Sequence, residues 1–430
     1  MLLGFSHNDL AIFAFCTEMK NRNLVLSIAG ASLGYFVDVF DLNVFNVISK
    51  QSLKAIGITD PSIIASYDYQ LLLWQLFGLL VGGFAWGILG DKVGRKQILF
   101  GSIIVYSIAN IANAFVTTIP EYIVVRFIAG FGLAGELGGA ITLTSEIMDK
   151  EKRGYGTMII VTLGALGAVT AALVSRTHFT IFGLANWQSM YILGGILGLA
   201  LLVFRAVSME SKMFERAKST AFRKGSLSIL VKNKKRLKLY LSCVLIGLPN
   251  WYCLGVLTKF SETFGQVNGV VGEKISVATC IMYSFIGLAI GDLLSGWMSQ
   301  HFRSRKKVIF WYFNFSVIFM LVYLFGKGIS SFQFYTLNLL LGITTGYWVL
   351  FVSLAAEQFG TNIRATVTTS VPSLVRGLII PVTLLYKLLE TSIGSIYGAA
   401  IVGVMTMILA YFGLFHVQET FGKELDYEEH

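Results

Sequence analysis

Apolar residues along the chain fall into twelve long runs separated by mostly short polar stretches. A helix that crosses a bilayer needs about 20 mostly apolar residues, and each run approaches or exceeds that length. The runs lie at residues 24–48, 70–90, 97–117, 121–147, 154–176, 188–206, 238–261, 273–299, 307–326, 332–357, 365–389 and 393–416. The pattern therefore predicts an all-α membrane protein with twelve transmembrane helices.

One polar stretch, residues 207–237, is much longer than the others and divides the runs six plus six. It predicts two six-helix bundles joined by a linker. The expected segments are an N-terminal segment 1–23, a first bundle 24–206, the linker 207–237, a second bundle 238–417 and a tail 418–430.

Lysine and arginine residues gather in the loops on one side of the predicted membrane, including the linker. Basic residues are enriched in the cytoplasmic loops of membrane proteins. The N-terminal segment, the linker and the tail are therefore predicted to be cytoplasmic. Residues 1–23 contain Asp9 and Glu18 and lack a small-residue cleavage site, which argues against a removed signal peptide. The expected location is the inner membrane of a bacterium.

The composition narrows the class of protein further. Only 13% of the 430 residues are charged and 55% are hydrophobic, whereas soluble proteins carry about 25% charged residues. The net charge of +10 could suggest a nucleic-acid binder, but so few charges cannot cover a soluble surface. The four cysteines and five histidines show no metal-ligand or disulfide spacing. We therefore expect a lipid bilayer as the surroundings, no nucleic-acid partner, no cofactor or metal, and no enzymatic activity.

The two predicted halves repeat a polar signature. Glu146 at the end of one run is followed seven residues later by Arg153, and Glu357 is followed in the same way by Arg364. The two glutamates are separated by 211 residues, and Gly87 is separated from Gly296 by 209. Duplicated six-helix halves around a central site are a recurrent design of transporters.

The segment Gly87-Ile-Leu-Gly-Asp91-Lys-Val-Gly94-Arg95-Lys96 resembles the signature loop of the major facilitator superfamily, G-x-L-x-D-x-x-G-R-K. Three other segments resemble metabolite:proton symporters and, more distantly, sugar porters. They are Asp38-Val-Phe-Asp41, Arg126-Phe-Ile-Ala-Gly-Phe-Gly-Leu-Ala-Gly-Glu136 and Glu419-Thr-Phe-Gly-Lys-Glu-Leu425. The resemblance implies two pseudo-symmetric six-helix bundles, the major facilitator fold, and transport by alternating access.

The signature loop and the repeated pairs are the predicted gate. Glycine permits close helix approach and a tight turn, and the charges can cluster when the cytoplasmic face is closed. The alternative is a set of solvated loops that only set the topology. Gln300 replaces the acidic residue in the second copy of the loop, so that copy is expected to contribute less. The predicted gating residues are Gly87, Asp91, Gly94, Arg95, Lys96, Glu146, Arg153, Glu357 and Arg364.

Ionisable residues inside the spans are the candidates for function. A charged side chain at the centre of a membrane helix costs about 2.5–3.5 kcal/mol on insertion scales, so it is expected to face a polar cavity. The six such residues are Asp38, Asp41, Arg126, Glu136, Asp292 and Arg376.

The acidic members are candidates for carrying protons. Asp38 and Asp41 are three residues apart and so share a helix face, where mutual repulsion favours holding a proton. Either one could instead pair with Arg126, and Glu136 is a third candidate that could instead tie two helices together. The pattern does not choose among the three.

The two arginines are candidates for binding an anion. A guanidinium in a dry cavity suits a carboxylate or phosphate. Arg376 could alternatively pair with Asp292 or a backbone carbonyl, and Arg126 with Asp38 or Asp41. The predicted substrate-binding residues are Arg126, Arg376, Tyr35, Asn250, Tyr283 and Trp348. Further residues could line the same cavity, namely Asn43, Asn46, Gln75, Trp251, Asn338 and Tyr347.

The sequence therefore predicts a secondary active transporter, working as a monomer, that couples protons to symport of a small anionic or zwitterionic metabolite such as a carboxylate or amino acid. Two other functions stay open. One is proton-driven export of a siderophore, drug or other metabolite. The other, less favoured, is a sensor that transports nothing, since the longest loop is too short for a soluble sensing domain.

Overall fold

The computed structural model describes residues 22–175, 177, 180–206, 225 and 227–429. Most of the predicted N-terminal segment 1–23 and linker 207–237 lies outside these residues. In the first half the helices are α2 (Arg22–Ala55), α3 (Pro61–Val93), α4 (Arg95–Asn113), α5 (Ile119–Ile147), α6 (Arg153–Val174) and α7 (Asn186–Ala206).

The second half is also helical. Its elements are α9 (Leu227–Lys232), α10 (Lys234–Tyr252), the π-helix η1 (Cys253–Leu257), α11 (Ser261–Val267), α12 (Val277–His301), α13 (Arg305–Phe325), α14 (Ser331–Thr345), α15 (Trp348–Gln358), α16 (Arg364–Gly377), α17 (Ile379–Ile393) and α18 (Ser395–His416).

The fold matches the predicted twelve membrane helices. Within the described residues, ten helical segments are long and apolar enough to cross a membrane. Three of these segments join two elements each, α10 with η1, α14 with α15, and α16 with α17. The remaining two spans are α4 and α7, whose apolar stretches are shorter or less hydrophobic.

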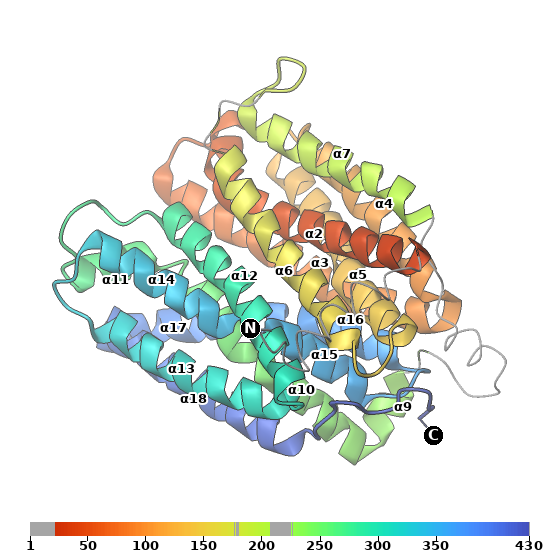
Figure 1. Ribbon diagram of the computed structural model, residues 1–430. Helices are drawn as coiled ribbons and strands as arrows, with labels where there is room; N and C mark the ends of the chain where they lie inside the picture. Colours follow the sequence, from red (N-terminus) through yellow and green to blue (C-terminus); the bar gives the residue numbers. More distant parts are fainter. Residues whose placement is uncertain (1–21, 176, 178–179, 207–224, 226, 430) are drawn as a thin grey trace, which may run out of the picture.

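The helices pack as two groups that meet along a long interface (Figure 1). Within the first group α2 packs on α6 and α7, and α3 and α4 pack on α5. Within the second, α12 packs on α14, and α18 on α10, α13 and α17. Between the groups, α16 contacts α3 and α5, and α12 contacts α6.

Local sequence signals set where several helices begin. Thr118 and Glu121 form a capping box at the start of α5, and Ser330 and Gln333 form another at α14. Such caps satisfy backbone N–H groups that a helix end leaves unpaired. Between α3 and α4 the only residue is Gly94, whose φ of 130° is readily adopted by glycine alone. The predicted tight turn is therefore present.

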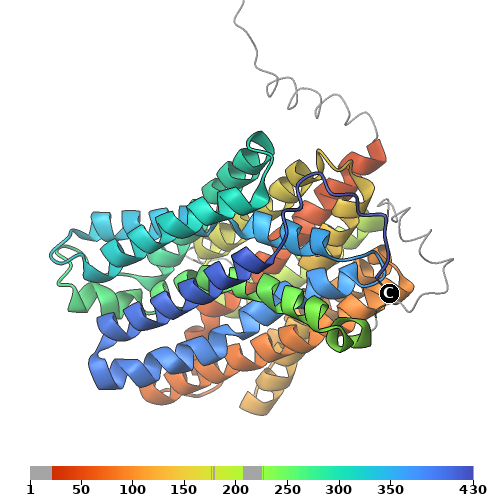
Figure 2. The same cartoon turned by 90° about the horizontal axis from the view of Figure 1, so that it is seen from below.

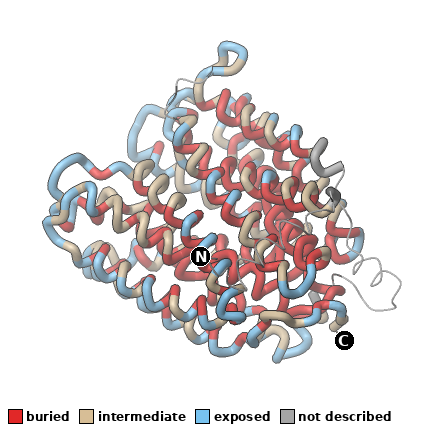
Figure 3. The backbone as a smooth tube through the Cα atoms, in the orientation of Figure 1, coloured by how far each residue is buried: buried red, intermediate tan, exposed pale blue. Residues whose placement is uncertain are grey.

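Buried residues concentrate where α5, α15 and α16 lie together, whereas the outer helices carry many exposed positions (Figure 3). Several exposed residues are large and apolar, for example Ile108, Phe315, Leu388 and Ile408, each more than half exposed. A soluble monomer rarely shows so large an apolar surface. An outer surface of this kind suits contact with lipid chains.

The helices α3 and α5 approach closely at two glycines. A Cβ atom on Gly130 would collide with the backbone carbonyl of Gln75, and one on Gly78 would collide with that of Phe127. These contacts involve backbone atoms, which cannot move aside as a flexible side chain can. The two helices therefore depend on glycine at both positions.

We expect Gly130→Leu to lower the free energy of unfolding by about 2 kcal/mol or more, because overpacking forces the helices apart. The control is Gly30→Ala in α2, where a Cβ would meet nothing within 4 Å. Thermal unfolding of the purified proteins measures both. Equal stability of Gly130→Leu and the wild type would contradict the close packing of α3 on α5.

Candidate functional site

A cavity of about 610 Å³ lies between the two groups of helices. Its lining includes the exposed Lys50 and Lys274 at one end, which we call the open end. The buried part of the lining includes Tyr35, Trp348 and Arg376. These side chains come from α2, α15 and α16, so both halves contribute to the same cavity.

The structure brings together four of the six predicted substrate-binding residues. The four that line the cavity are Tyr35, Asn250, Trp348 and Arg376. Arg126 and Tyr283 are not in the lining. Of the additional candidates, Asn43, Asn46, Gln75 and Trp251 line it, whereas Asn338 and Tyr347 do not.

Arg376 is the arginine of the cavity wall. Its Nη1 lies 3.9 Å from Asp38 Oδ2, and its Nη2 donates a long hydrogen bond of 3.4 Å to Tyr35 Oη. The guanidinium also lies 5.6 Å from the ring centre of Trp251, and Nε has no hydrogen-bond partner among the described residues. The predicted pairing with Asp292 is not the one observed, because the nearby carboxylate belongs to Asp38.

Asp38 and Asp41 are both buried but have different neighbours. Asp38 contacts Arg376 of the other half, whereas Asp41 Oδ1 lies against Gly194 of α7, where a Cβ would collide with it. A spacing of three residues puts them on one side of α2. Although the two carboxylates share that side of the helix, only Asp38 forms an ion pair with Arg376.

Arg126 is fully buried behind the cavity. Its Nη2 donates to Gln75 Oε1, and its guanidinium lies 4.3 Å from the ring centre of Phe45. Nε and Nη1 have no hydrogen-bond partner within the described chain. Gln75 itself lines the cavity, so its side chain lies between Arg126 and the cavity. Its predicted substrate-binding role remains a prediction.

Glu136 and Tyr283 lie away from the cavity lining. Glu136 is fully buried and accepts a hydrogen bond of 2.9 Å from Ser102 Oγ of α4. This contact agrees with the alternative that Glu136 ties two helices together. Tyr283 packs its ring on Tyr335, with centroids 5.6 Å apart.

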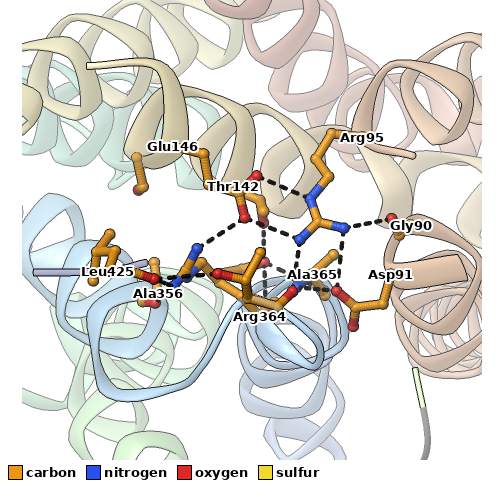
Figure 4. Close-up of polar contacts among 12 residues, drawn as sticks. Gly90, Asp91, Arg95, Thr142, Glu146, Ala356, Arg364, Ala365 and Leu425 are labelled. Atoms are coloured by element: carbon orange, nitrogen blue, oxygen red, sulfur yellow. Dashed lines mark hydrogen bonds and ion pairs between the residues drawn. The ribbon is translucent and has the colours of Figure 1, made fainter. Parts of the chain in front are cut away.

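At the end of the bundle opposite to the open end, buried charges form a charge cluster. It consists of Asp91, Arg95, Glu146, Arg153, Arg305, Glu357 and Arg364. Arg95 donates two hydrogen bonds to Glu146, Nε to Oε2 at 3.1 Å and Nη2 to Oε1 at 2.9 Å. Arg364 donates to the same Oε1 at 2.9 Å. Figure 4 shows these side chains meeting from α4, α5 and α16.

The second part of the cluster surrounds Glu357. Arg153 of α6 donates Nε to Glu357 Oε1 at 2.6 Å. Arg305 of α13 donates to both carboxylate oxygens, also at 2.6 Å. Thr420 Oγ1 donates a further hydrogen bond at 2.6 Å. All three charged side chains are at most 3% exposed.

The observed pairing corrects the one suggested by the spacing. Glu146 and Arg153 are separated by seven residues, and so are Glu357 and Arg364, yet neither glutamate forms its ion pair with the arginine that follows it. Arg364 binds Glu146 and Arg153 binds Glu357, so each ion pair joins the two halves. The turn after each glutamate starts a new helix that faces the other half. The side chains of both ion pairs are buried.

The signature loop contributes Asp91 to the interface between halves. Asp91 accepts hydrogen bonds from the backbone N–H groups of Ala365 and Thr366, at 3.0 and 2.8 Å, and so caps α16. A carboxylate at a helix N-terminus is favoured by the helix dipole. Next to it, Gly87 lies so close to α16 that a Cβ would be 2.7 Å from the Cα of Thr366.

Lys96 lies beside the cluster, with its ammonium 5.9 Å from the ring centre of Phe100. In the second copy of the loop, Gly296 packs on Met158 of α6 as Gly87 packs on α16. Gln300 lies against Gly154 near the start of α6, but α6 has no side-chain cap there. Of the two copies of the signature loop, only the first therefore places an acidic cap on a helix of the other half, namely Asp91 on α16.

The tail after α18 crosses this end of the molecule (Figure 2). Arg364 Nη2 donates to the carbonyl of Leu425 at 2.6 Å, and Arg153 Nη2 donates to that of Lys423 at 2.9 Å. Burial alone would raise the pKa of Glu419, but hydrogen bonds from Ser304 Oγ and the N–H of Arg305 outweigh it and lower that pKa. The tail thus binds groups from both halves.

Sequence reasoning did not include several of these residues. Arg305 and Thr420 were absent from the predicted gate, although Arg305 belongs to the second copy of the loop. Asp292 was expected, as a charge in a span, to face a polar cavity, and it lines one, but it was not among the substrate-binding candidates. The signal was present in both cases, namely a charge in a repeated motif and a charge in a span.

Comparison with known proteins agrees with this architecture. The family model described as Major Facilitator Superfamily matches residues 31–383. The chain belongs to the major facilitator superfamily. As in transporters of this family, the function lies in moving a small molecule through a membrane and not in catalysing a reaction.

Among the relatives of this major facilitator protein is the putative niacin/nicotinamide transporter NiaP of Bacillus subtilis. It is 26% identical over 90% of this chain and 89% of its own length. The 3-(3-hydroxy-phenyl)propionate transporter of Escherichia coli is 28% identical over 84% of this chain and 89% of its own. The sialic acid transporter NanX of Escherichia coli is 26% identical over 65% of this chain and 66% of its own.

A solved structure shows the same fold. The proton:xylose symporter XylE bound to 6-bromo-6-deoxy-D-glucose aligns with a TM-score of 0.76 at 16% sequence identity. The alignment covers 94% of this chain and 98% of that one.

The exchange of ion pairs between halves can be tested by a double-mutant cycle. We expect Arg364→Gln and Glu146→Gln to show a coupling of about 1 kcal/mol or more, because the residues are in contact. The matched cycle uses Arg153→Gln with Glu146→Gln, the pair suggested by the spacing, and is expected to show the smaller coupling, because Arg153 forms its ion pair with Glu357. Unfolding midpoints of the purified variants measure both. A larger coupling in the second cycle would contradict the observed pairing.

Proposed function

We propose that this transporter carries small carboxylates together with protons by alternating access. The observation that supports it most is Arg376, a guanidinium in the cavity wall whose Nε has no hydrogen-bond partner among the described residues. A guanidinium there can bind a carboxylate through two hydrogen bonds. Trp251 and Trp348, whose ring centres are 6.3 Å apart, offer apolar surface for the body of the molecule.

Names of relatives agree with this substrate class. Several are named for molecules that carry a carboxyl group, such as niacin, 3-(3-hydroxy-phenyl)propionate, benzoate and sialic acid. The first three of these molecules also contain an aromatic ring, which suits a cavity whose wall holds two indole rings. We therefore favour an aromatic carboxylate over an aliphatic amino acid.

The contact between Asp38 and Arg376 supports proton coupling. While Asp38 is ionised, it offers the guanidinium a negative partner at 3.9 Å. A substrate carboxylate that binds Arg376 adds a second negative charge beside the first. Like charges at this separation favour protonation of one of them. A proton on Asp38 and an anion on Arg376 therefore bind together, and a monoanion crosses without net charge.

Alternating access requires the charge cluster to open. In this structure the cavity reaches the solvent at the open end, and the cluster joins the halves at the other. We assign the cluster to the cytoplasmic side because basic loops are cytoplasmic, and we propose a monomer in the inner membrane of a bacterium. The same cycle runs as import or export according to the gradients, so export of a metabolite stays the second candidate.

Transport in proteoliposomes tests the proposal, with radiolabelled benzoate and nicotinate as probes. With an alkaline interior we expect wild type to accumulate at least one of them faster than protein-free liposomes, which the neutral acids enter by diffusion, and a protonophore to abolish the accumulation. Arg376→Ala is expected to lower uptake by about 10-fold or more, because it removes a hydrogen bond to a charged group. Asp38→Asn is expected to keep exchange of labelled for unlabelled substrate but to lose accumulation.

The control is Arg303→Ala, an exposed arginine outside the cavity lining, which should transport as wild type does. Normal uptake by Arg376→Ala would show that the substrate is not held by this arginine. Accumulation by Asp38→Asn at the wild-type level would remove Asp38 as the proton carrier while leaving carboxylate transport intact.

A further inference from the structure

Asp292 is the buried acid of the cavity wall that the transport scheme does not use. It lies in the middle of α12, has no exposed surface and belongs to the cavity lining. Its Oδ1 accepts a hydrogen bond of 3.3 Å from the backbone N–H of Val349. Its Oδ2 has no hydrogen-bond partner among the residues that the structure describes.

The hydrogen bond to Oδ1 holds Asp292 beside a break in the helix of the tenth span. Helix α14 ends at Thr345 and α15 begins at Trp348, so the first N–H groups of α15 need acceptors other than the preceding turn. Asp292 supplies one acceptor. On the same helix, Ser295 Oγ donates to the carbonyl of Gly346 at 2.6 Å. The carboxylate is therefore fixed in position, and only its second oxygen is available.

No cation of the cavity neutralises this oxygen. Among the ion pairs of the described residues, Arg376 pairs with Asp38 and Lys274 pairs with Glu262. Asp292 takes part in none. A buried acceptor without a partner is costly, and an ionisable residue in a membrane span marks a functional site by default. A ligand group that donates a hydrogen bond would remove that cost.

Contacts along the wall relate Asp292 to the anion site. Arg376 lies over Trp251, Trp251 contacts Trp348 edge to face, and Trp348 is followed by Val349, which bonds to Asp292. In this order of contacts, two indole rings come between a group that attracts a carboxylate and a group that accepts a hydrogen bond, and all four side chains line the same cavity. A flat molecule with polar groups at both ends suits this order.

We propose that Asp292 is a second polar subsite, which accepts a hydrogen bond from a hydroxyl or amino group of the substrate while Arg376 holds its carboxylate. The inference rests on the proposed transport of carboxylates and sharpens it. The substrate is a ring carboxylate with a hydrogen-bond donor, and Asp292 selects it over the same acid without the donor.

Binding of three matched acids to the purified protein tests the subsite. The probes are benzoate, 3-hydroxybenzoate and 4-hydroxybenzoate, measured by calorimetry. We expect wild type to bind at least one hydroxybenzoate about 10-fold or more tightly than benzoate, as a hydrogen bond to a charged acceptor provides. Asp292→Ala is expected to abolish this preference and to leave the Kd for benzoate within about threefold of the wild type.

Two further variants separate the subsite from its effect on the helix interruption. Asp292→Asn keeps an oxygen for the Val349 N–H and removes the charge, so it should fold normally and lose about threefold or more of the preference. Ser295→Ala removes the other contact at the interruption and lies outside the cavity lining. It should keep the full preference.

Several outcomes would overturn the subsite. One is equal binding of the three acids by wild type, and another is an equal loss of affinity for all three in Asp292→Ala. The others are an unchanged preference in Asp292→Asn and a loss of preference in Ser295→Ala as large as that in Asp292→Ala. Acids that bind through Arg376 without any dependence on Asp292 would leave the proposed function standing. If wild type binds none of the three, the subsite is overturned, and the uptake of nicotinate decides separately whether carboxylate transport stands.

Discussion

The structure depends on one constraint, that a guanidinium removed from water needs an anionic or carbonyl partner. Four arginines of the charge cluster are at most 2% exposed, namely Arg95, Arg153, Arg305 and Arg364. Removing one partner of such a buried pair typically costs about 3–5 kcal/mol. Because Arg364 finds its carboxylate in the first half and Arg153 finds its carboxylate in the second, the halves must stay together at this end for the charges to be satisfied. Separation is favourable only when water enters and solvates all of them.

The balance of charges explains why the tail is bound there. The cluster holds four arginines but three acids, Asp91, Glu146 and Glu357, so the carboxylates cannot accept every N–H. Backbone carbonyls of the tail, at Lys423 and Leu425, accept the remaining bonds of Arg153 and Arg364. Carbonyl acceptors complete the coordination without adding a charge that would need its own partner. The tail therefore belongs to the interface between the halves.

The sequence predicted those features of the structure that the spacing of residues can encode. Hydrophobic runs gave the spans, because membrane helices need a length that the pattern records directly, and Gly94 and Asp91 marked a turn and a cap. Spacing could not reveal which glutamate each arginine meets, since Arg153 and Arg364 occupy equivalent places in a repeated motif and either choice satisfies the repeat. Nor could it separate Asp38 from Asp41. Their different partners depend on how α2 is rotated between α7 and α16.

Helix α16 connects the charge cluster to the cavity. It begins at Arg364, where Asp91 caps it, and carries Arg376 twelve residues later, about 18 Å along the axis at 1.5 Å per residue. Pro372 lies inside this helix and removes one of its backbone hydrogen bonds, but both arginines belong to the same continuous element, so a shift that releases the capped end from the first half can also move the guanidinium against Asp38. Conversely, neutralising the attraction between Asp38 and Arg376 removes one of the contacts that hold α16 against α2. In the proposed transport cycle, substrate and proton therefore bias the closed end without touching it, because the contact that they change lies on the same helix as that end.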